Sequence, residues 1–134
     1  MSLRFATLAA TALLALLAGC AQQPVATAAA PVGLLDVAER PAEKALLTGM
    51  RAYDDAQYPA AEKNLLAALQ AGLASPRDRA AAHKLLAFIY CTSNRSADCE
   101  AQFRSARAAD PAFALSKSEA GHPLWGPVYQ RVQR

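Results

Sequence analysis

From Pro41 onward, apolar and small residues recur at three- and four-residue spacing along this chain. That spacing places them on one face of a helix, whereas a half-buried strand would alternate apolar and polar residues. Three prolines, at positions 41, 59 and 76, stand where a first helical turn tolerates a missing N–H, and Gly72 supplies a helix stop. No stretch beyond the N-terminal apolar run alternates like a strand. The pattern therefore predicts an all-α domain over residues 37–134.

The predicted helices form two pairs. Ser75, with Asp78 three residues later, is the expected N-cap of the third helix, and Ser96 is the expected N-cap of the fourth. The four helices are expected at 41–56, 59–72, 76–92 and 97–109.

The tail, residues 112–134, is predicted to close the domain. It should contain one capped turn from Ser116 to Gly121 and a last helix that starts at His122-Pro123 and runs through Val132. Stacked helical pairs expose apolar end faces, so an array of them needs capping elements. We expect the end of the second pair to be covered by Phe113, Leu115, Leu124 and Trp125.

The first 19 residues have the parts of a secretory signal: Arg4, an uncharged apolar run over 5–18, and small residues before a cleavage point. The motif Leu17-Ala18-Gly19-Cys20 resembles the lipobox of bacterial lipoprotein precursors. The resemblance implies a diacylglyceryl group on Cys20, cleavage before that residue and acylation of the new amino terminus. The alternative is a transmembrane anchor, but the apolar run is shorter than the roughly 20 residues that span a bilayer.

Residues 20–36 are predicted to form a flexible tether behind the lipid. Ala21–Pro31 contains no charge, two prolines and mostly small residues, so it cannot build a core. Val32–Val37 is apolar enough to dock on the domain. The ordered region should therefore begin near residue 37.

The two helical pairs show an internal repeat. Gly49 aligns with Ala87, which puts a small residue at one helix crossing in both pairs. The same frame aligns Ala61 with Cys99, Leu65 with Phe103, and Ala68 with Ala106. These positions resemble the tetratricopeptide (TPR) pattern, with repeats at about 42–72 and 80–111, although the linker is longer than the usual TPR period allows. The alternative is a four-helix bundle with chance spacing.

Three stretches carry a more specific resemblance: AHKLLAFIYC over 82–91, CEAQFRSARAADPAFALSKSEAGHPLWGPVY over 99–129, and the lipobox. Together they are similar to small TPR-type envelope lipoproteins, in particular the TssQ-type lipoproteins associated with type VI secretion. The ending AGHPLWGPVY is the most specific part. The resemblance implies an accessory, non-enzymatic envelope component, and it transfers no catalytic residue.

Cys91 and Cys99 are eight residues apart across one predicted helical turnaround. The predicted periplasmic compartment is oxidising, which favours a disulfide between them. We expect their Cα atoms near the upper limit of about 7 Å for a bridge. The alternative is two reduced core cysteines. A catalytic cysteine is not expected, because no base is placed beside either thiol.

No catalytic, cofactor or metal site is predicted. His83 and His122 are the only histidines, and no His/Asp/Glu cluster supplies the ligands of a metal site. We expect His83 to pack at a helix crossing with one hydrogen bond and His122 to cap a helix. The formal net charge is +3 without a basic stripe, so nucleic acid is not an expected partner. Because no catalytic motif is visible, a small-molecule substrate is not expected either.

In TPR-type arrays the first helix of each pair lines the inner, concave surface. Here that surface would present Leu46, Met50 and Tyr53 from the first pair and Lys84 and Phe88 from the second. Methionine beside aromatic residues makes an adaptable apolar groove that can take a peptide or a partner helix. The alternative is that Val32–Val37 or the C-terminal helix covers these residues.

These features predict a lipid-anchored periplasmic adaptor that acts by protein–protein binding in a cell-envelope machine, which the resemblance implies is type VI secretion. Ala21 after Cys20 is compatible with the outer membrane, because the Asp that retains many lipoproteins in the inner membrane is absent; the inner membrane is the alternative. A second prediction is a pilotin-like lipoprotein that targets a secretin or pilus component to the outer membrane. An envelope enzyme or its regulator is the least supported class.

Overall fold

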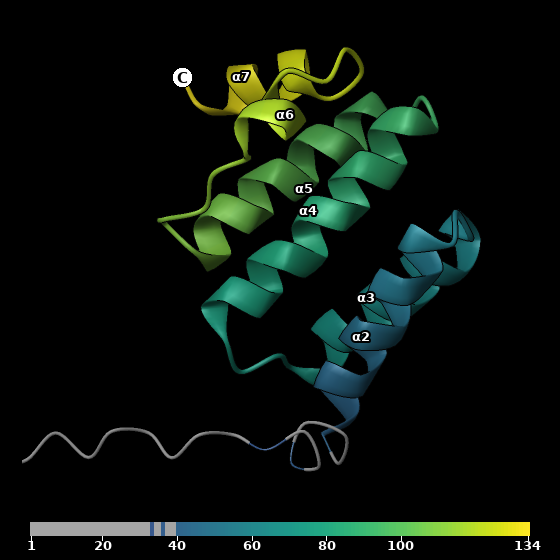
Figure 1. Ribbon diagram of the computed structural model, residues 1–134. Coiled ribbons are helices and arrows are strands. Elements are labelled where there is room, and N and C mark those ends of the chain that lie inside the picture. The colour runs from purple at the N-terminus through teal and green to yellow at the C-terminus, as the bar shows by residue number, and fades with distance from the viewer. Residues whose placement is uncertain (1–32, 34–35, 37–39) are drawn as a thin grey trace, which may run out of the picture. The chain divides into compact units, whose positions relative to one another are not determined.

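A computed structural model describes Gly33, Asp36 and residues 40–134 of the chain. The predicted signal peptide, Cys20 and all of the predicted tether except Gly33 and Asp36 lie outside the described residues. Within residues 40–134 every regular element is a helix, which confirms the all-α prediction for this part of the chain (Figure 1). The elements are α2 (Pro41–Asp54), α3 (Tyr58–Ala71), α4 (Pro76–Thr92), α5 (Ser96–Ala109), α6 (Lys117–Ala120) and α7 (Gly126–Val132).

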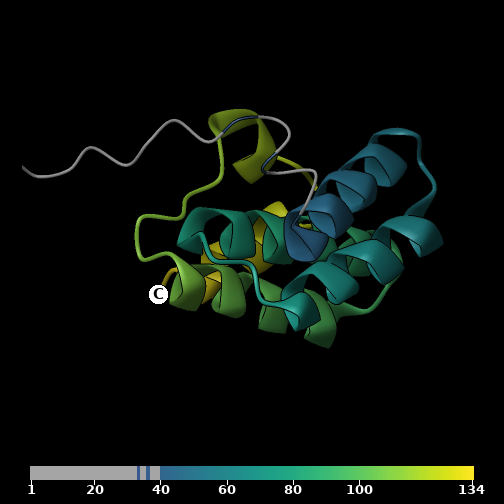
Figure 2. The same cartoon turned by 90° about the horizontal axis from the view of Figure 1, so that it is seen from below.

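The helices pack as two antiparallel pairs, α2 with α3 and α4 with α5, and α4 also contacts both helices of the first pair (Figures 1 and 2). Gly49 lies at the crossing of α2 and α3. A Cβ atom on Gly49 would stand 2.9 Å from Leu65 Cγ and 3.1 Å from the Leu65 backbone nitrogen. Only a residue without a side chain lets the two helices approach this closely, so the predicted small-residue crossing is confirmed in the first pair.

The loop between the two helices has the same backbone geometry in both pairs. The two loops are as far apart in the sequence as Gly49 is from Ala87. Each turn contains one non-glycine residue in the left-handed region, Ala56 with φ 58° and Asn94 with φ 59°. In each, the next residue donates its N–H to a carbonyl near the end of the preceding helix, Gln57 to Ala52 at 2.7 Å and Arg95 to Tyr90 at 2.8 Å. The backbone therefore repeats with the period that the side-chain pattern predicted.

Replacing Ala56 by glycine is expected to stabilise the protein. A left-handed conformation costs an L-residue about 1–2 kcal/mol, and glycine avoids this cost but loses more chain entropy on folding. We expect a net gain of about 0.5–1 kcal/mol in the free energy of unfolding, measured by urea denaturation. The control is Ala101→Gly at an exposed position inside α5, which should lose about 1 kcal/mol. A loss in both variants would show that the left-handed turn at Ala56 is not strained.

The C-terminal tail covers the second pair, as predicted. Val128 and Tyr129 of α7 are buried, and the Tyr129 ring centroid lies 5.3 Å from that of Phe103, which is fully buried in α5. The Tyr129 hydroxyl also accepts a hydrogen bond from the Leu115 backbone N–H at 3.1 Å. Three of the four predicted covering residues, Phe113, Leu115 and Trp125, pack against the core. The prediction for Leu124 was wrong, because 54% of this residue is exposed.

Two predicted helix starts are confirmed in detail. The Ser75 hydroxyl accepts the Asp78 N–H at 3.2 Å at the start of α4. Ser116 and Glu119 form a reciprocal capping box, in which each side chain accepts the other residue's backbone N–H. These short-range motifs depend only on residues three apart, so the sequence is sufficient to identify them.

Two other predicted starts are wrong. Ser96 is the first residue of α5, and Arg95 precedes it without a side-chain cap. The last helix begins at Gly126, three residues after Pro123, because residues 123–125 form a turn. Within that turn His122 Nδ1 accepts the Leu124 N–H at 3.2 Å, so His122 caps a turn and not a helix.

Candidate binding surface

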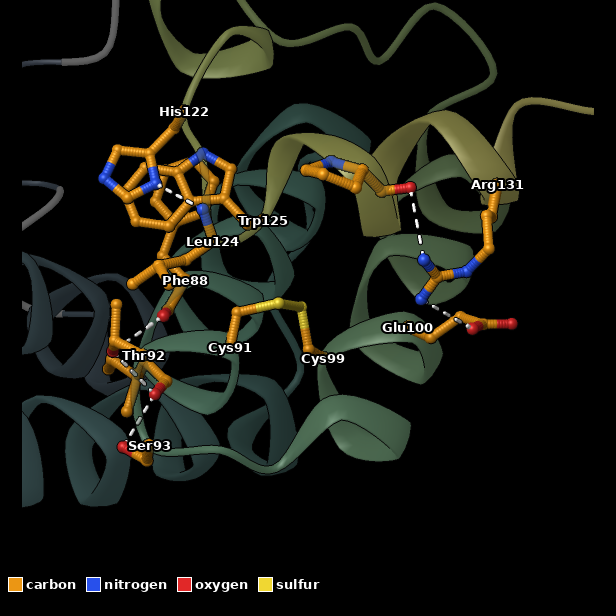
Figure 3. The surroundings of a disulfide bond; sticks show 12 residues. Phe88, Cys91, Thr92, Ser93, Cys99, Glu100, His122, Leu124, Trp125 and Arg131 are labelled. Atoms are coloured by element: carbon orange, nitrogen blue, oxygen red, sulfur yellow. Dashed lines mark hydrogen bonds and ion pairs between the residues drawn. A yellow bond between two sulfur atoms is a disulfide. The ribbon is translucent and has the colours of Figure 1, made fainter.

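A disulfide joins Cys91, near the end of α4, to Cys99 in the first turns of α5 (Figure 3). Their Cα atoms are 5.2 Å apart, closer than the sequence predicted, because a tight left-handed turn at Asn94 brings the two helix ends together. Both residues are buried. The bond therefore clamps the second pair at its closed end, and neither sulfur is available as a nucleophile.

The predicted concave residues do not form one open surface. Leu46 is 6% exposed and Phe88 is 4% exposed, whereas Met50 is 37% exposed. Tyr53 and Lys84 are half-buried. The C-terminal tail covers Phe88, which is the second pair's part of this surface. Coverage of the groove by the C-terminal part of the chain is one of the two alternatives stated above. A partner-binding role for the five residues stays a prediction, and the accessible part of the surface lies on α2.

Trp125 covers Phe88 by direct stacking, with ring centroids 4.2 Å apart (Figure 3). The His122 ring stacks in turn on Trp125 at 3.3 Å and nearly parallel. The indole Nε1 of Trp125 donates a hydrogen bond to the Glu119 carbonyl at 2.8 Å, which fixes the orientation of the ring. The AGHPLWGPVY segment thus packs on Phe88 of α4 through stacked aromatic rings, and we call it the aromatic clasp.

An ion pair fastens Glu119, the residue just before this segment, to α4. Lys84 Nζ lies 2.7 Å from Glu119 Oε1, and both side chains are about three-quarters covered. Partial burial raises the pKa of the Glu119 carboxyl, but hydrogen bonds from Lys84 and Ser116 outweigh it and hold the pKa below its usual value. Lys84 is therefore engaged within the chain itself.

Gly126 allows the clasp to close. An added Cβ would overlap the Ala120 carbonyl oxygen, a backbone atom that cannot turn aside. Gly126→Ala should therefore lift Trp125 from Phe88 and lower the free energy of unfolding by about 1–3 kcal/mol. Because Trp125 is the only tryptophan, a red shift of the intrinsic fluorescence should report this change.

The matched control is Gly121→Ala in the same segment. Its added Cβ would meet the Lys117 carbonyl at 3.3 Å, and its φ of −82° suits alanine. This variant should keep the emission maximum and change stability by about 0.5 kcal/mol or less. Equal fluorescence shifts in both variants would contradict the close packing inferred at Gly126.

Two hollows lie beside the first helices of the pairs. The first has a volume of about 500 Å³ and is lined on α2 by Leu46, Leu47 and Met50. The second has a volume of about 490 Å³ and lies between α4, with Arg77 and Lys84, and the chain around Phe113. Leu47, which is 43% exposed, and Arg77 were not singled out from the sequence. No periodic signal distinguishes them from other surface residues.

The remaining predicted sites can be placed as follows. His83 packs between α4 and α5, and its Nδ1 is 2.7 Å from Gln102 Oε1, which is the single hydrogen bond expected for it. Among the residues that the structure describes, no group of three or more His, Cys, Asp or Glu side chains could hold a metal ion. None of the described helices is long and apolar enough to cross a bilayer.

Comparison of the chain with known protein families, curated proteins and solved structures finds no match.

Proposed function

We propose that this chain is a lipid-anchored periplasmic adaptor with a TPR-like domain, which binds a protein partner in a cell-envelope machine and performs no turnover. The observation that carries the proposal is the exposed apolar surface of α2. Leu47 and Met50 remain exposed at a hollow, although the chain covers the corresponding inner face of α4 with its own tail. An exposed apolar hollow on a rigid scaffold is typical of protein–protein contact.

The repeated turns at Ala56 and Asn94 support the TPR-like part of the proposal. In each turn one non-glycine residue has a left-handed backbone conformation, and the residue after it makes the same backbone hydrogen bond. The two turns are as far apart in the sequence as the aligned side chains Gly49 and Ala87. The disulfide and the aromatic clasp add rigidity to the second pair. A rigid scaffold suits binding, because little conformational entropy is lost when the partner docks.

The location is proposed from the N-terminal sequence. The lipobox at residues 17–20 and the uncharged stretch behind it support a lipid anchor and a spacer. Ala21 supports the outer membrane, on its periplasmic face. The resemblance of the 82–91 and 99–129 segments to TssQ-type lipoproteins supports a role in type VI secretion.

The test is a mild-crosslinking pull-down of the full-length lipoprotein from membranes, read by mass spectrometry. Recovery of type VI membrane-complex or baseplate proteins would support the proposed adaptor. Recovery of a secretin or pilus component would replace it with the pilotin-like alternative. Recovery of no protein above the level of a mock purification would contradict a partner-binding function.

A further inference from the structure

The two hollows occupy equivalent places in the two repeats. When the two repeats are aligned so that Gly49 matches Ala87, Glu43 and Leu46 of the first hollow match Ala81 and Lys84 of the second. The same alignment matches residues 74 and 75, which lead into α4, with residues 112 and 113, which lead into the tail. Each hollow therefore lies between a first helix and the chain that leads to the next element.

The two hollows have different chemistry. The first is lined on α2 by three large apolar side chains, Leu46, Leu47 and Met50. The second has two cationic residues on α4, Arg77 and Lys84. Lys84 is already paired with Glu119. Arg77 is exposed, and no carboxylate within residues 40–134 forms a salt bridge with it.

The charges around the hollows differ in sign. The first hollow carries two carboxylates, Glu43 and Asp78, against the single cation Arg40, which lies 4.0 Å from Glu43. The second hollow carries two cations, Arg77 and Lys84, against the single carboxylate Asp110, which also accepts the Ala112 backbone N–H at 2.9 Å. A carboxylate on a ligand would thus be disfavoured at the first hollow and attracted to Arg77 at the second.

We propose that the two hollows form one bipartite surface for an extended peptide segment of a protein partner. The segment places a large apolar side chain in the first hollow, on Leu47 and Met50, and an Asp or Glu side chain on Arg77 at the second. Asp78 lines the first hollow and its chain neighbour Arg77 lines the second, so the two hollows adjoin at the first turn of α4. An extended chain rises about 3.3 Å per residue, so the two side chains of the segment stand about two to four residues apart. This inference rests on the proposed function, since it defines the partner of the same concave face.

The test is a selection of phage-displayed random dodecapeptides on the full chain in detergent. Selected peptides are expected to share a large apolar residue and an acidic residue at the stated spacing. Binding of a selected peptide, measured by fluorescence polarisation, should weaken about tenfold in Met50→Ser and in Arg77→Glu. The Arg77 effect should shrink at high salt, because salt screens an exposed charge pair.

Two matched variants control for nonspecific effects. Leu124→Ser removes an exposed apolar side chain that lines neither hollow, and Lys63→Glu reverses an exposed charge on α3 outside both hollows. Both should bind the selected peptide like the unchanged protein. All four variants replace exposed side chains, so their thermal unfolding should stay close to that of the unchanged protein.

Three outcomes would overturn the bipartite surface: no peptide is selected, the selected peptides lack either feature, or the control variants weaken binding as much as Met50→Ser and Arg77→Glu. A partner that is still recovered from membranes with Met50→Ser and Arg77→Glu would leave the adaptor standing and reject this surface. Conversely, peptide binding with the predicted variant effects would support the surface even if the membrane pull-down returned no partner.

Discussion

Replacing Cys20 by alanine is expected to move the protein from the membrane fraction to the soluble periplasmic fraction. The predicted modification places three acyl chains on one residue, each of which contributes about 0.8 kcal/mol per buried CH₂, whereas a single acyl chain gives only marginal binding. Without the sulfur no diacylglyceryl group can be attached, so we expect an all-or-none change. The measurement is fractionation followed by detection of the protein in pellet and supernatant.

Gln22→Ala is the control for this substitution, because it changes a neighbouring residue and keeps the lipobox. It should remain in the membrane pellet, and the mass of its amino-terminal peptide should include the lipid. If the Cys20→Ala protein still sediments with membranes after cleavage of residues 1–19, which the mass of its amino-terminal peptide reports, the lipid anchor is wrong and another segment must hold the protein there.

The second large effect is expected from the Cys91→Ala/Cys99→Ala double variant. The bond closes a short loop, since the two residues are eight apart, and the loop-entropy relation gives about 2.5 kcal/mol for a loop of this size. A small domain is typically stable by about 5–15 kcal/mol, so the loss removes a large share of the stability. Urea denaturation of the oxidised protein and the double variant should measure this difference.

A reducing agent supplies the control. It should lower the stability of the unchanged protein to about that of the double variant and leave the double variant unaffected. A double variant within about 0.5 kcal/mol of the oxidised protein would show that the hairpin turn at Asn94 is fixed by packing alone. The clamp would then carry no part in keeping the second repeat rigid.

The helical pairs could be predicted from the sequence because their signals are local and periodic. Gly49 marked the crossing with Leu65, Ser75 and Ser116 marked helix starts, and the Cys91–Cys99 spacing across one turnaround gave the disulfide. Each of these depends on the helical period or on residues a few positions apart. The internal repeat was visible for the same reason.

The tail was harder to predict, because residues 121–125 have no period. The sequence identified Trp125 as a covering residue but placed it inside a helix, whereas it precedes α7 and stacks between Phe88 and His122. Leu124 was expected to cover the end of the second pair and is instead exposed. In such a segment the backbone path decides which side chain points inward, and that path depends on contacts such as Gly126 on Ala120.

The candidate surface was predicted only in part. Met50 was identified, but Phe88 was assigned to the same groove although Trp125 covers it. Leu47 and Arg77 were missed, since an exposed residue beside a helix face has no signature in the pattern of apolar positions. Each hollow is lined by a first helix together with the chain that enters α4 or the tail, segments that are far apart in the sequence and meet only in the folded protein.

The central claim is that the chain works by holding a protein partner against the inner face of its helical repeats. The most direct measurement is site-specific photo-crosslinking in intact cells, with a photoreactive residue at Leu47 and, as the control, at Lys63 on α3. The account predicts one defined crosslinked protein from the Leu47 position and no such product from Lys63. A defined product from Lys63 together with none from Leu47 would contradict it.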